Sequence, residues 1–264
     1  MKTELIVSTY NSPRALNLCL TSVACQRLRP DSICIADDGS GPETARSIAE
    51  FAAAHPELRL RHVWHEDRGF EKGAILNKAM ASSEADFLVF IDGDVLIHPD
   101  FIARHVQLAQ RGRFCTGSLI RLDTPTTAIV TPEMVRDGTV FARRWLKTMP
   151  FPMAVMNLLD LLTPVQKALC GANASLFRDD ALAVNGYDEQ IKYGGGDKDF
   201  GVRLANRGIR GRHLRYTAPL VHLDHPRGYA DPQKIKRHKQ KIRERRCSRQ
   251  YWVEDGISKG PQPA

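Results

Sequence analysis

The residues best placed to do chemistry are two aspartates on either side of a glycine, Asp92-Gly93-Asp94. They follow an apolar run, residues 87–91, that predicts a buried strand. Carboxylates at the carboxyl end of a central strand are hard oxygen ligands for Mg²⁺ or Mn²⁺, and such an ion bridges the phosphates of a substrate. Because Asp-Gly-Asp is also common in solvated turns, the metal prediction depends on the elements around the triplet.

Strand-like and helix-like segments alternate around this triplet. The predicted strands span residues 5–9, 33–36, 58–63 and 87–91, and the predicted helices begin at Pro13 and span residues 42–54 and 71–80. In the first helix Leu16, Leu20 and Val23 recur at helical spacing. This alternation predicts an α/β fold with a doubly wound, mostly parallel sheet and right-handed crossovers.

Polar clusters follow three of these strands, and parallel strands bring them to one edge of the sheet. The clusters are Ser8-Thr9-Tyr10-Asn11, Asp37-Asp38-Gly39-Ser40 and Asp92-Gly93-Asp94. Neither Gly-x-Gly-x-x-Gly nor Gly-x-x-x-x-Gly-Lys-[Ser/Thr] follows the first strand. We therefore expect a metal and carboxylates, in place of a glycine-rich loop, to hold any diphosphate at this edge.

The three polar clusters resemble, in their order along the chain, the motifs of family 2 glycosyltransferases with the GT-A fold. Asp67-x-Gly69-Phe70 and Asn77, which lie between the second and third clusters, belong to the same resemblance. The second half resembles a C-terminal galactosyltransferase-type region. Its motifs are Gly171-Ala172-Asn173-Ala174, Asn185-Gly186-Tyr187-Asp188-Glu189, Tyr193-Gly194-Gly195-Gly196-Asp197-Lys198-Asp199, Arg203-Leu204 and His222-Leu223-Asp224-His225. The resemblance covers about residues 3–226 and implies a GT-A nucleotide-diphospho-sugar transferase fold.

The resemblance implies a set of nucleotide-sugar contacts. Asp38 would accept a hydrogen bond from the uracil N3–H or the ribose, with Asp37 as the alternative, and Lys72 would meet a phosphate as a point charge. The remaining contacts implied for the donor come from Thr9, Asn11, Asp67, Asn77 and Asp92. Two alternatives stay open: Asp37-Asp38-Gly39-Ser40 as a turn and helix cap, and Lys72 as a solvated helix lysine.

The resemblance also implies a metal site made of Asp94, His222 and His225. Residues 220–221 read as the end of a short strand, so the histidines leave the sheet there. Two imidazoles and a carboxylate suit Mn²⁺ better than Mg²⁺, and phosphate oxygens would complete the coordination.

Asp197 is the candidate catalytic base, because it stands at the Asp of the family's aromatic-Gly-x-Glu-Asp pattern. For inversion at the anomeric carbon, one carboxylate takes the proton of the acceptor hydroxyl. The sequence departs from the pattern at Gly196, where the family has Glu, and at Tyr193, where it usually has Trp. We therefore expect Tyr193 on the acceptor loop, Asp199 covering part of the missing glutamate's role, and the glycines giving a loop that closes over the donor.

At 264 residues, one α/β domain with a C-terminal extension is expected. We assign residues 1–228 to the transferase domain, with a nucleotide-binding half at about 1–120 and an acceptor and metal half at about 121–228, and residues 229–264 to the extension. No signal peptide or membrane-spanning helix is evident, since residues 153–162 are too short and contain Asn157 and Asp160. Six scattered cysteines, mostly at apolar strand or helix positions, fit reduced core residues and the cytoplasm.

The basic charge is concentrated near the C-terminus. From Lys234 to Arg249 there are nine Lys or Arg and one acid, Glu244, so this segment carries the net charge of +8 found for the whole chain. A helix from Pro232 to about Tyr251 would attract an anionic membrane surface, and residues 141–162 would add an interfacial patch, making the enzyme peripheral on the inner face of the cell membrane. The alternative is a helix packed on the domain. Nucleic acid is not an expected partner, because no reading motif is present.

Together these observations predict an inverting, metal-dependent glycosyltransferase. It would move a hexose or N-acetylhexosamine from a UDP-sugar to a hydroxyl of a glycan or lipid-linked glycan, of the cell-surface polysaccharide or lipopolysaccharide type. A metal-dependent nucleotidyltransferase or phosphohydrolase acting on sugar nucleotides is the alternative, since such enzymes also use Asp-Gly-Asp. The donor sugar, the acceptor and the linkage are left open, because galactose- and glucose-type donors differ in one hydroxyl configuration.

Overall fold

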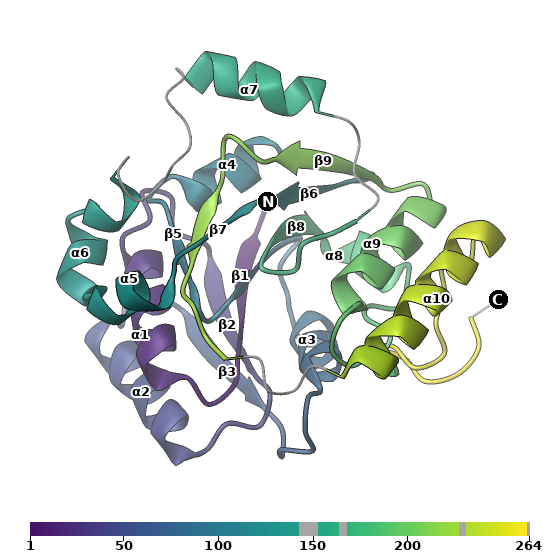
Figure 1. Ribbon diagram of the computed structural model, residues 1–264, viewed down its shortest axis with the longest axis horizontal. Helices are drawn as coiled ribbons and strands as arrows, with labels where there is room; N and C mark the ends of the chain where they lie inside the picture. The colour runs from purple at the N-terminus through teal and green to yellow at the C-terminus, as the bar shows by residue number, and fades with distance from the viewer. Residues whose placement is uncertain (143–152, 164–167, 227–230, 263–264) are drawn as a thin grey trace.

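The computed structural model describes residues 1–142, 153–163, 168–226 and 231–262. A seven-stranded sheet has the order β3-β2-β1-β4-β8-β6-β9 (Figure 1). Its strands are β1 (Thr3–Thr9), β2 (Ser32–Asp37), β3 (Leu60–Trp64), β4 (Phe87–Asp92), β6 (Arg113–Gly117), β8 (Asn173–Phe177) and β9 (Arg210–Leu214). The first four are parallel, and β8 is antiparallel to both of its neighbours. The predicted α/β fold with a mostly parallel sheet is confirmed.

A second sheet of three short strands holds part of the site. Its order is β5 (Val95–Ile97), β10 (Leu220–His222) and β7 (Leu119–Arg121). β10 is antiparallel to β5, with His222 opposite Val95, and parallel to β7. This pairing brings the end of β10 next to the residues that follow β4.

The helices cover both faces of the large sheet (Figure 1). They are α1 (Pro13–Ala24), α2 (Pro42–Ala54), α3 (Lys72–Ala81), α4 (Phe101–Gln107), α5 (Thr124–Ile129), α6 (Pro132–Arg136), α7 (Met153–Leu162), α8 (Arg178–Leu182), α9 (Gly196–Asn206) and α10 (Pro232–Ser248), with a 3₁₀ turn at Thr139–Phe141. α1 and α2 both begin with proline at the first turn, where its missing N–H costs nothing. The predicted helices at Pro13, 42–54 and 71–80 agree with α1, α2 and α3 to within a residue or so at their ends.

Alternation along β1 divides the core into layers. Leu5 and Val7 pack in one cluster with Leu16 and other residues of α1 and α2, whereas Ile6 packs in another with α3 and with Phe200 of α9. The predicted apolar stripe Leu16, Leu20 and Val23 is fully buried. A strand with apolar side chains on both faces has to lie inside such a three-layer arrangement.

The C-terminal residues pack on the domain. α10 lies along α9 (Figure 1), Ile242 and Arg245 are buried, and beyond the helix Val253 is buried as well. Asn185 Nδ2 donates to the carbonyl oxygens of Val253 and Ser258, at 2.6 and 2.7 Å. Of the two alternatives for the basic segment, the packed helix is therefore present. The expected boundary at residues 228–229 lies outside the described residues.

Asp160 is a polar anchor that holds α7 to the domain. The buried carboxylate of Asp160 accepts hydrogen bonds from the backbone N–H of Tyr216 and Thr217 and from Thr217 Oγ1. Much of the apolar surface of α7 faces solvent, including Met153, Val155, Leu158, Leu161 and Leu162. Among the described residues, no helix is long and apolar enough to cross a bilayer. Residues 143–152 of the expected interfacial patch lie outside the described part of the chain.

Candidate active site

The three polar clusters meet at one edge of the sheet, as predicted. Ser8 Oγ donates to Asp92 Oδ1 at 2.8 Å, and the Gly93 N–H donates to the Ser8 carbonyl at 2.7 Å. A Cβ on Gly93 would lie 3.1 Å from that carbonyl oxygen, which explains a glycine between the two acids. Thr9 Oγ1 is buried at this edge and has no hydrogen-bond partner among the described residues.

Asn11 joins the first two clusters to each other. Its N–H donates to Ser40 Oγ at 2.8 Å, and its Oδ1 accepts from the Gly41 N–H at 2.9 Å. Its φ is positive, at 42°, a conformation that asparagine tolerates better than most residues. The geometry therefore gives Asn11 a turn-forming role at the rim of the site.

Asp94, His222 and His225 form a cluster suited to a metal ion. Asp94 Oδ1 lies 3.7 Å from His222 Nε2 and Asp94 Oδ2 lies 3.0 Å from His225 Nε2, and one donor atom of each residue falls within 4.8 Å of the others. The Leu223 N–H donates to the Asp94 carbonyl at 2.9 Å, which ties the end of β10 to the triplet. Asp94 Oδ1 is buried without a hydrogen-bond partner among the described residues. An unsatisfied buried carboxylate oxygen beside two imidazoles fits the donor set of a divalent metal.

The local charges keep the cluster's carboxylate ionised. Burial raises the pKa of Asp94, but the hydrogen bond from His225 and the nearby His222 and Lys72 outweigh burial, and the net pKa is lowered. His225 Nδ1 lies 2.9 Å from the Pro226 carbonyl, which leaves Nε2 directed at Asp94. A second hydrogen bond of this kind sets the orientation of metal-binding histidines.

Lys72 reaches into the same edge from the first turn of α3. Its Nζ lies 2.5 Å from Asp92 Oδ1. Burial lowers the pKa of Lys72, but Asp92, Asp197 and Asp94 together raise it above its ordinary value, so the ammonium stays charged. Lys72 is thus part-buried and paired with an acid at this edge, which does not fit the solvated-lysine alternative.

Asp197 lies at the N-terminal turn of α9, near Lys72 and Asp92. Tyr187 Oη donates to Asp197 Oδ1 at 3.3 Å, and a Cβ on Gly171 would overlap the Asp197 carboxylate. Burial raises the pKa of Asp197, Asp92 adds to the rise, and Lys72 opposes it, with a net increase. A carboxylate whose pKa is shifted upwards is a better proton acceptor than an ordinary aspartate.

The two acids of Asp37-Asp38 have different environments. Asp37 is fully buried, where its Oδ1 accepts from the Ser40 N–H and its Oδ2 lies 3.0 Å from His62 Nε2. Asp38 Oδ1 lies 2.8 Å from His65 Nε2 and its Oδ2 accepts from the Glu71 N–H at 2.9 Å. Asp37 is enclosed within the turn, and both oxygens of Asp38 are also paired within the protein, so the geometry does not separate the two acids as nucleotide contacts.

Asp67 and Tyr10 form the exposed part of the expected nucleotide site. Tyr10 Oη donates to Asp67 Oδ2 at 2.9 Å, and the tyrosine is 46% exposed, so its ring is available to a ligand. Gly39 has φ +91°, and a Cβ there would lie 2.6 Å from Asp67 Cα. Glycine therefore allows the second cluster to approach Asp67 closely.

Two predicted contacts have structural roles instead. Asn77 is buried on α3, where it donates to the Tyr187 carbonyl at 2.9 Å and accepts from the Tyr187 N–H at 2.7 Å. Asp199 is fully buried, with its oxygens 2.7 Å from Arg203 Nε and 2.6 Å from Arg245 Nη1. Neither carboxamide nor carboxylate is turned to a substrate, so these two predictions are corrected. Helical spacing gave a signal in both cases: Asn77 lies on the apolar face of α3, and Asp199 pairs with Arg203 four residues on.

The Tyr193 loop is held between two parts of the chain. Lys192 Nζ lies 2.6 Å from Glu71 Oε1, and the rings of Phe70 and Tyr193 meet edge to face at 5.5 Å between centroids. Sequence reasoning missed Lys192, and it also missed Tyr187 as the partner of Asp197. No motif signals either contact, because each joins segments that are far apart in the chain.

The chain is similar in fold to solved glycosyltransferases. It superposes on the mannosyltransferase PcManGT from Pyrobaculum calidifontis, solved with GDP-Man and Mn²⁺, with a TM-score of 0.61 and 20% identity over 86% of this chain and 58% of that one. It also superposes on S. aureus TarS 1–349 in complex with UDP-GlcNAc, with a TM-score of 0.60 and 15% identity over 92% of this chain and 65% of that one.

Sequence comparison gives the family. The model of glycosyl transferase family 2 matches residues 4–177, and that of the N-terminal domain of galactosyltransferase matches residues 158–226. The chain therefore belongs to glycosyl transferase family 2. A curated relative is the uncharacterized glycosyltransferase YfnE of Bacillus subtilis (strain 168), 25% identical over 86% of this chain and 66% of the relative. The chain spans two thirds or less of the length of such relatives.

Proposed function

We propose that this chain is an inverting, metal-dependent glycosyltransferase. It transfers a hexose or N-acetylhexosamine from a UDP-sugar to a hydroxyl of a glycan or lipid-linked glycan, in the synthesis of cell-surface polysaccharide or lipopolysaccharide. The observation that carries this proposal is the meeting of Asp94, His222 and His225 at the edge that also holds Lys72 and Asp197. Family membership supports the transfer reaction itself.

Asp94, His222 and His225 would hold the divalent metal. Two imidazoles and one carboxylate favour Mn²⁺ over Mg²⁺, and PcManGT was solved with Mn²⁺ and its nucleotide sugar. When bound, the metal neutralises the nucleoside diphosphate as it leaves. The protonated Lys72 adds a positive charge at the same edge, paired with Asp92 until a phosphate competes for it.

Asp197 is the proposed base. Its Oδ1 accepts from Tyr187 Oη, and the carboxylate would take the proton of the acceptor hydroxyl. The electron pair of that O–H bond then forms the new bond to the anomeric carbon, while the bond to the diphosphate oxygen breaks and its electrons leave with the nucleotide. Attack opposite to the leaving group inverts the configuration of the anomeric centre.

The donor nucleotide is proposed to lie against Tyr10 and Asp67, with Asp38 at the inner end. TarS was solved with UDP-GlcNAc and PcManGT with GDP-Man, so the shared fold accommodates different bases. The choice of UDP rests on the resemblance of the Asp38 and Asp67 motifs. Competition between UDP and GDP in a binding titration tests it directly, and tighter GDP binding would overturn it.

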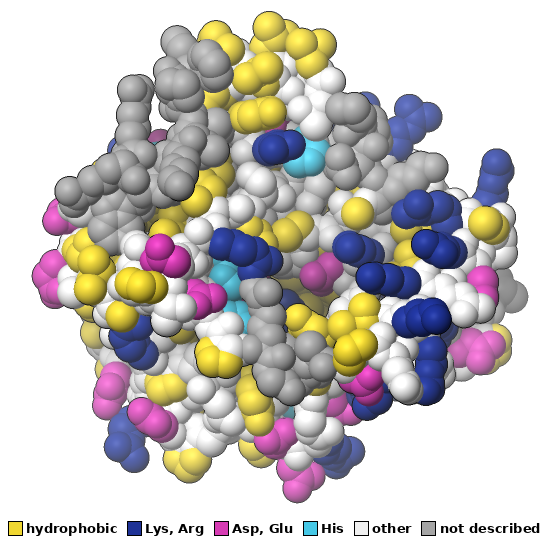
Figure 2. All heavy atoms as spheres, in the orientation of Figure 1, with side chains coloured by type: hydrophobic (Ala, Val, Ile, Leu, Met, Phe, Trp, Pro, Cys, Tyr) yellow, Lys and Arg dark blue, Asp and Glu magenta, His cyan; other side chains and the backbone are white. Residues whose placement is uncertain are grey.

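The second proposed partner is an anionic membrane surface on the cytoplasmic side. α10 presents an exposed face of cations, and α7 presents exposed apolar side chains. The exposed cations are Lys234, Lys236, Arg237, Lys239, Arg243, Arg246 and Arg249. Figure 2 shows Lys and Arg gathered over the region of α10 and apolar side chains over α7 on the same side of the molecule. Exposed cations together with exposed apolar side chains are the composition of an interfacial binding surface.

The membrane proposal is tested by flotation with vesicles. Binding should rise with the fraction of anionic lipid and fall with salt, because screening weakens the attraction. Replacing Lys236 and Arg243 by alanine should weaken vesicle binding. Replacing Arg111, an exposed cation outside α10, is the control and should leave binding unchanged. Equal binding to neutral and anionic vesicles would contradict a role for the cations.

Product analysis tests the proposed reaction. With a panel of UDP-sugars and Mn²⁺, we expect a glycoside with inverted anomeric configuration, identified by NMR, and no product in excess chelator. Pyrophosphate would indicate the nucleotidyltransferase alternative, and free sugar or sugar phosphate alone would indicate the phosphohydrolase. A retained configuration or full activity in chelator would overturn the mechanism.

A further inference from the structure

One face of α10 is directed at the loop that precedes Asp197. Ile235, His238, Ile242 and Arg245 recur at three- or four-residue spacing and are all more buried than the exposed cations of the opposite face. The helix thus has an inner face of mixed chemistry and an outer cationic face. The inner face is not explained by membrane binding.

This inner face is in direct contact with the Tyr193 loop. His238 Nδ1 lies 3.0 Å from the Tyr193 carbonyl oxygen. A Cβ on Gly194 would lie 2.6 Å from Ile235 Cγ1, and one on Gly195 would lie 3.1 Å from Ile242 Cδ1. The two glycines therefore let α10 rest on the loop backbone, a role different from the loop closure expected from the sequence.

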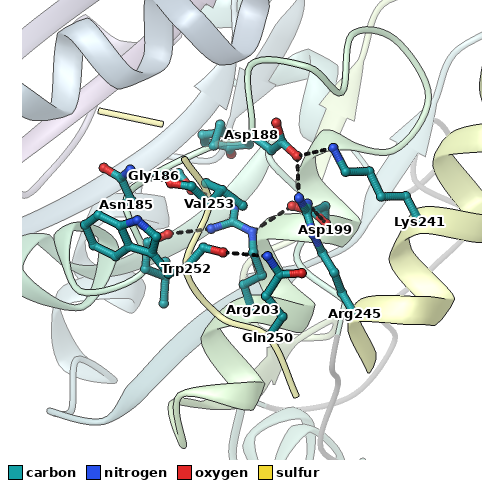
Figure 3. A network of polar contacts seen from close by, with 12 residues as sticks. Asn185, Gly186, Asp188, Asp199, Arg203, Lys241, Arg245, Gln250, Trp252 and Val253 are labelled. Carbon is teal, nitrogen blue, oxygen red and sulfur yellow. Dashed lines mark hydrogen bonds and ion pairs between the residues drawn. The ribbon is translucent and has the colours of Figure 1, made fainter. Parts of the chain in front are cut away.

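A second connection holds α9, the helix that contains Asp197. Arg245 donates from Nη1 to Asp199 Oδ1 and from Nη2 to Asp188 Oδ2, both at 2.6 Å. Figure 3 shows the Arg245 and Arg203 guanidinium groups meeting around Asp199, with Lys241 on Asp188. Asp199 lies in the first turn of α9, two residues beyond Asp197. α10 is therefore attached to the chain on both sides of Asp197.

We propose that α10 is a positioning element of the acceptor side of the site. Through His238 and Ile242 it sets the place of the Tyr193 loop, and through Arg245 it sets the first turn of α9, so that Asp197 is held in line with the acceptor hydroxyl. This proposal rests on the proposed transferase function. His238, Ile242 and Arg245 are positioning residues and touch no substrate.

The test begins with His238→Leu, which removes the hydrogen bond to Tyr193 and keeps an apolar side chain. We expect kcat to fall about tenfold, which is less than the ~10²-fold loss that a displacement of about 1 Å can cause. The acceptor KM should rise, and UDP affinity should stay within about twofold of wild type. His238→Asn, whose side-chain N–H stands where Nδ1 of the imidazole does, should recover most of the loss. Cys247→Ala, at an exposed position of the same helix with no role in the site or the cationic face, is the matched control and should behave as wild type.

A double-mutant cycle tests the glycine contact. Gly195→Ala should lower kcat, because the new methyl meets Ile242 Cδ1, and Ile242→Val removes that atom. The double variant should have a higher kcat than the product of the two single-variant effects predicts. The difference is the coupling energy, from which any backbone cost of alanine at residue 195 cancels. Additive effects would show that the contact does not act on the site.

Amide hydrogen exchange separates this proposal from the proposed function. In His238→Leu, peptides covering residues 192–199 should exchange faster, while those covering residues 3–9 should not change. If the wild type transfers no sugar but exchange changes in this way, the proposed function fails and the positioning contact stands. Unchanged exchange and unchanged kinetics would overturn the positioning role. Equal acceleration throughout the chain would also overturn it, because that result shows a general loss of stability.

Discussion

The metal side and the base side of the candidate site are assembled in different ways. Asp94 lies between β4 and β5, and His222 ends β10, so backbone pairing between β5 and β10 brings these ligands together. Asp197 begins a helix that is held by side chains, among them Arg245 from the last helix of the chain. Strand pairing is insensitive to most side-chain changes, whereas an ion-pair network fails when one partner is removed. We therefore expect the base side to be the more easily disturbed.

The largest effect should come from the base itself. Asp197→Asn should lower kcat by about 10²- to 10⁴-fold, the scale of positioned proton transfer, because the amide cannot accept the proton. Isothermal titration should show UDP-sugar affinity close to wild type. Asp179→Asn, exposed on α8, is a control that should leave both quantities unchanged. Parallel losses of affinity and rate would assign Asp197 to binding instead.

The network around α10 should be the next most sensitive part. Arg245→Met should lower the free energy of unfolding by about 3 kcal/mol, at the low end of the ~3–5 kcal/mol for breaking a buried pair, because Lys241 and Arg203 still face the two acids. Urea denaturation measures this change. Arg111→Ala removes an ion pair between exposed groups and should have a much smaller effect. Similar values for the two variants would contradict the comparison of buried and exposed pairs.

On the metal side the fold should survive while metal binding is lost. Asp94→Asn should weaken Mn²⁺ binding by more than the ~10–100-fold cost of losing an outer-shell partner, because a proposed ligand oxygen is replaced. Calorimetric titration with Mn²⁺ measures this affinity, and the thermal midpoint should fall little. His98→Gln, outside the cluster, is the control. An unchanged Mn²⁺ affinity in Asp94→Asn would remove the assignment.

The smallest expected effect is one of pH. Because the pKa of Asp197 is raised, kcat/KM should rise with pH through that pKa and then level off, and Asp197→Asn should remove this acidic limb. For an acid whose folded pKa lies above its unfolded pKa, stability falls as pH rises between the two values. Asp197→Asn should therefore be slightly more stable than wild type at neutral pH. A less stable variant would show that the charged carboxylate contributes to folding.

Much of the fold was predictable from local patterns. The N-terminal prolines of α1 and α2, the stripe of Leu16 with its partners, and the apolar runs of β1 and β4 each specify an element over a few residues. Asn77 and Asp199 were misassigned because family motifs do not distinguish a residue that contacts substrate from one that holds the motif in place. Burial on a helix face makes that distinction. Helical spacing signals such a face, and packing then shows which residues it encloses.

The sequence by itself determined the alternating elements, the polar clusters at the strand ends and the pair of histidines, because period and spacing are local properties of the chain. Only the tertiary structure decided which face of α10 turns inward, that Arg245 joins Asp188 and Asp199, and that Gly194 and Gly195 make room for that helix. In the sequence the Lys and Arg residues of α10 form one cationic segment, and packing then buries some of these side chains and exposes others. That separation depends on contacts between residues far apart in the chain, which spacing along the sequence does not encode.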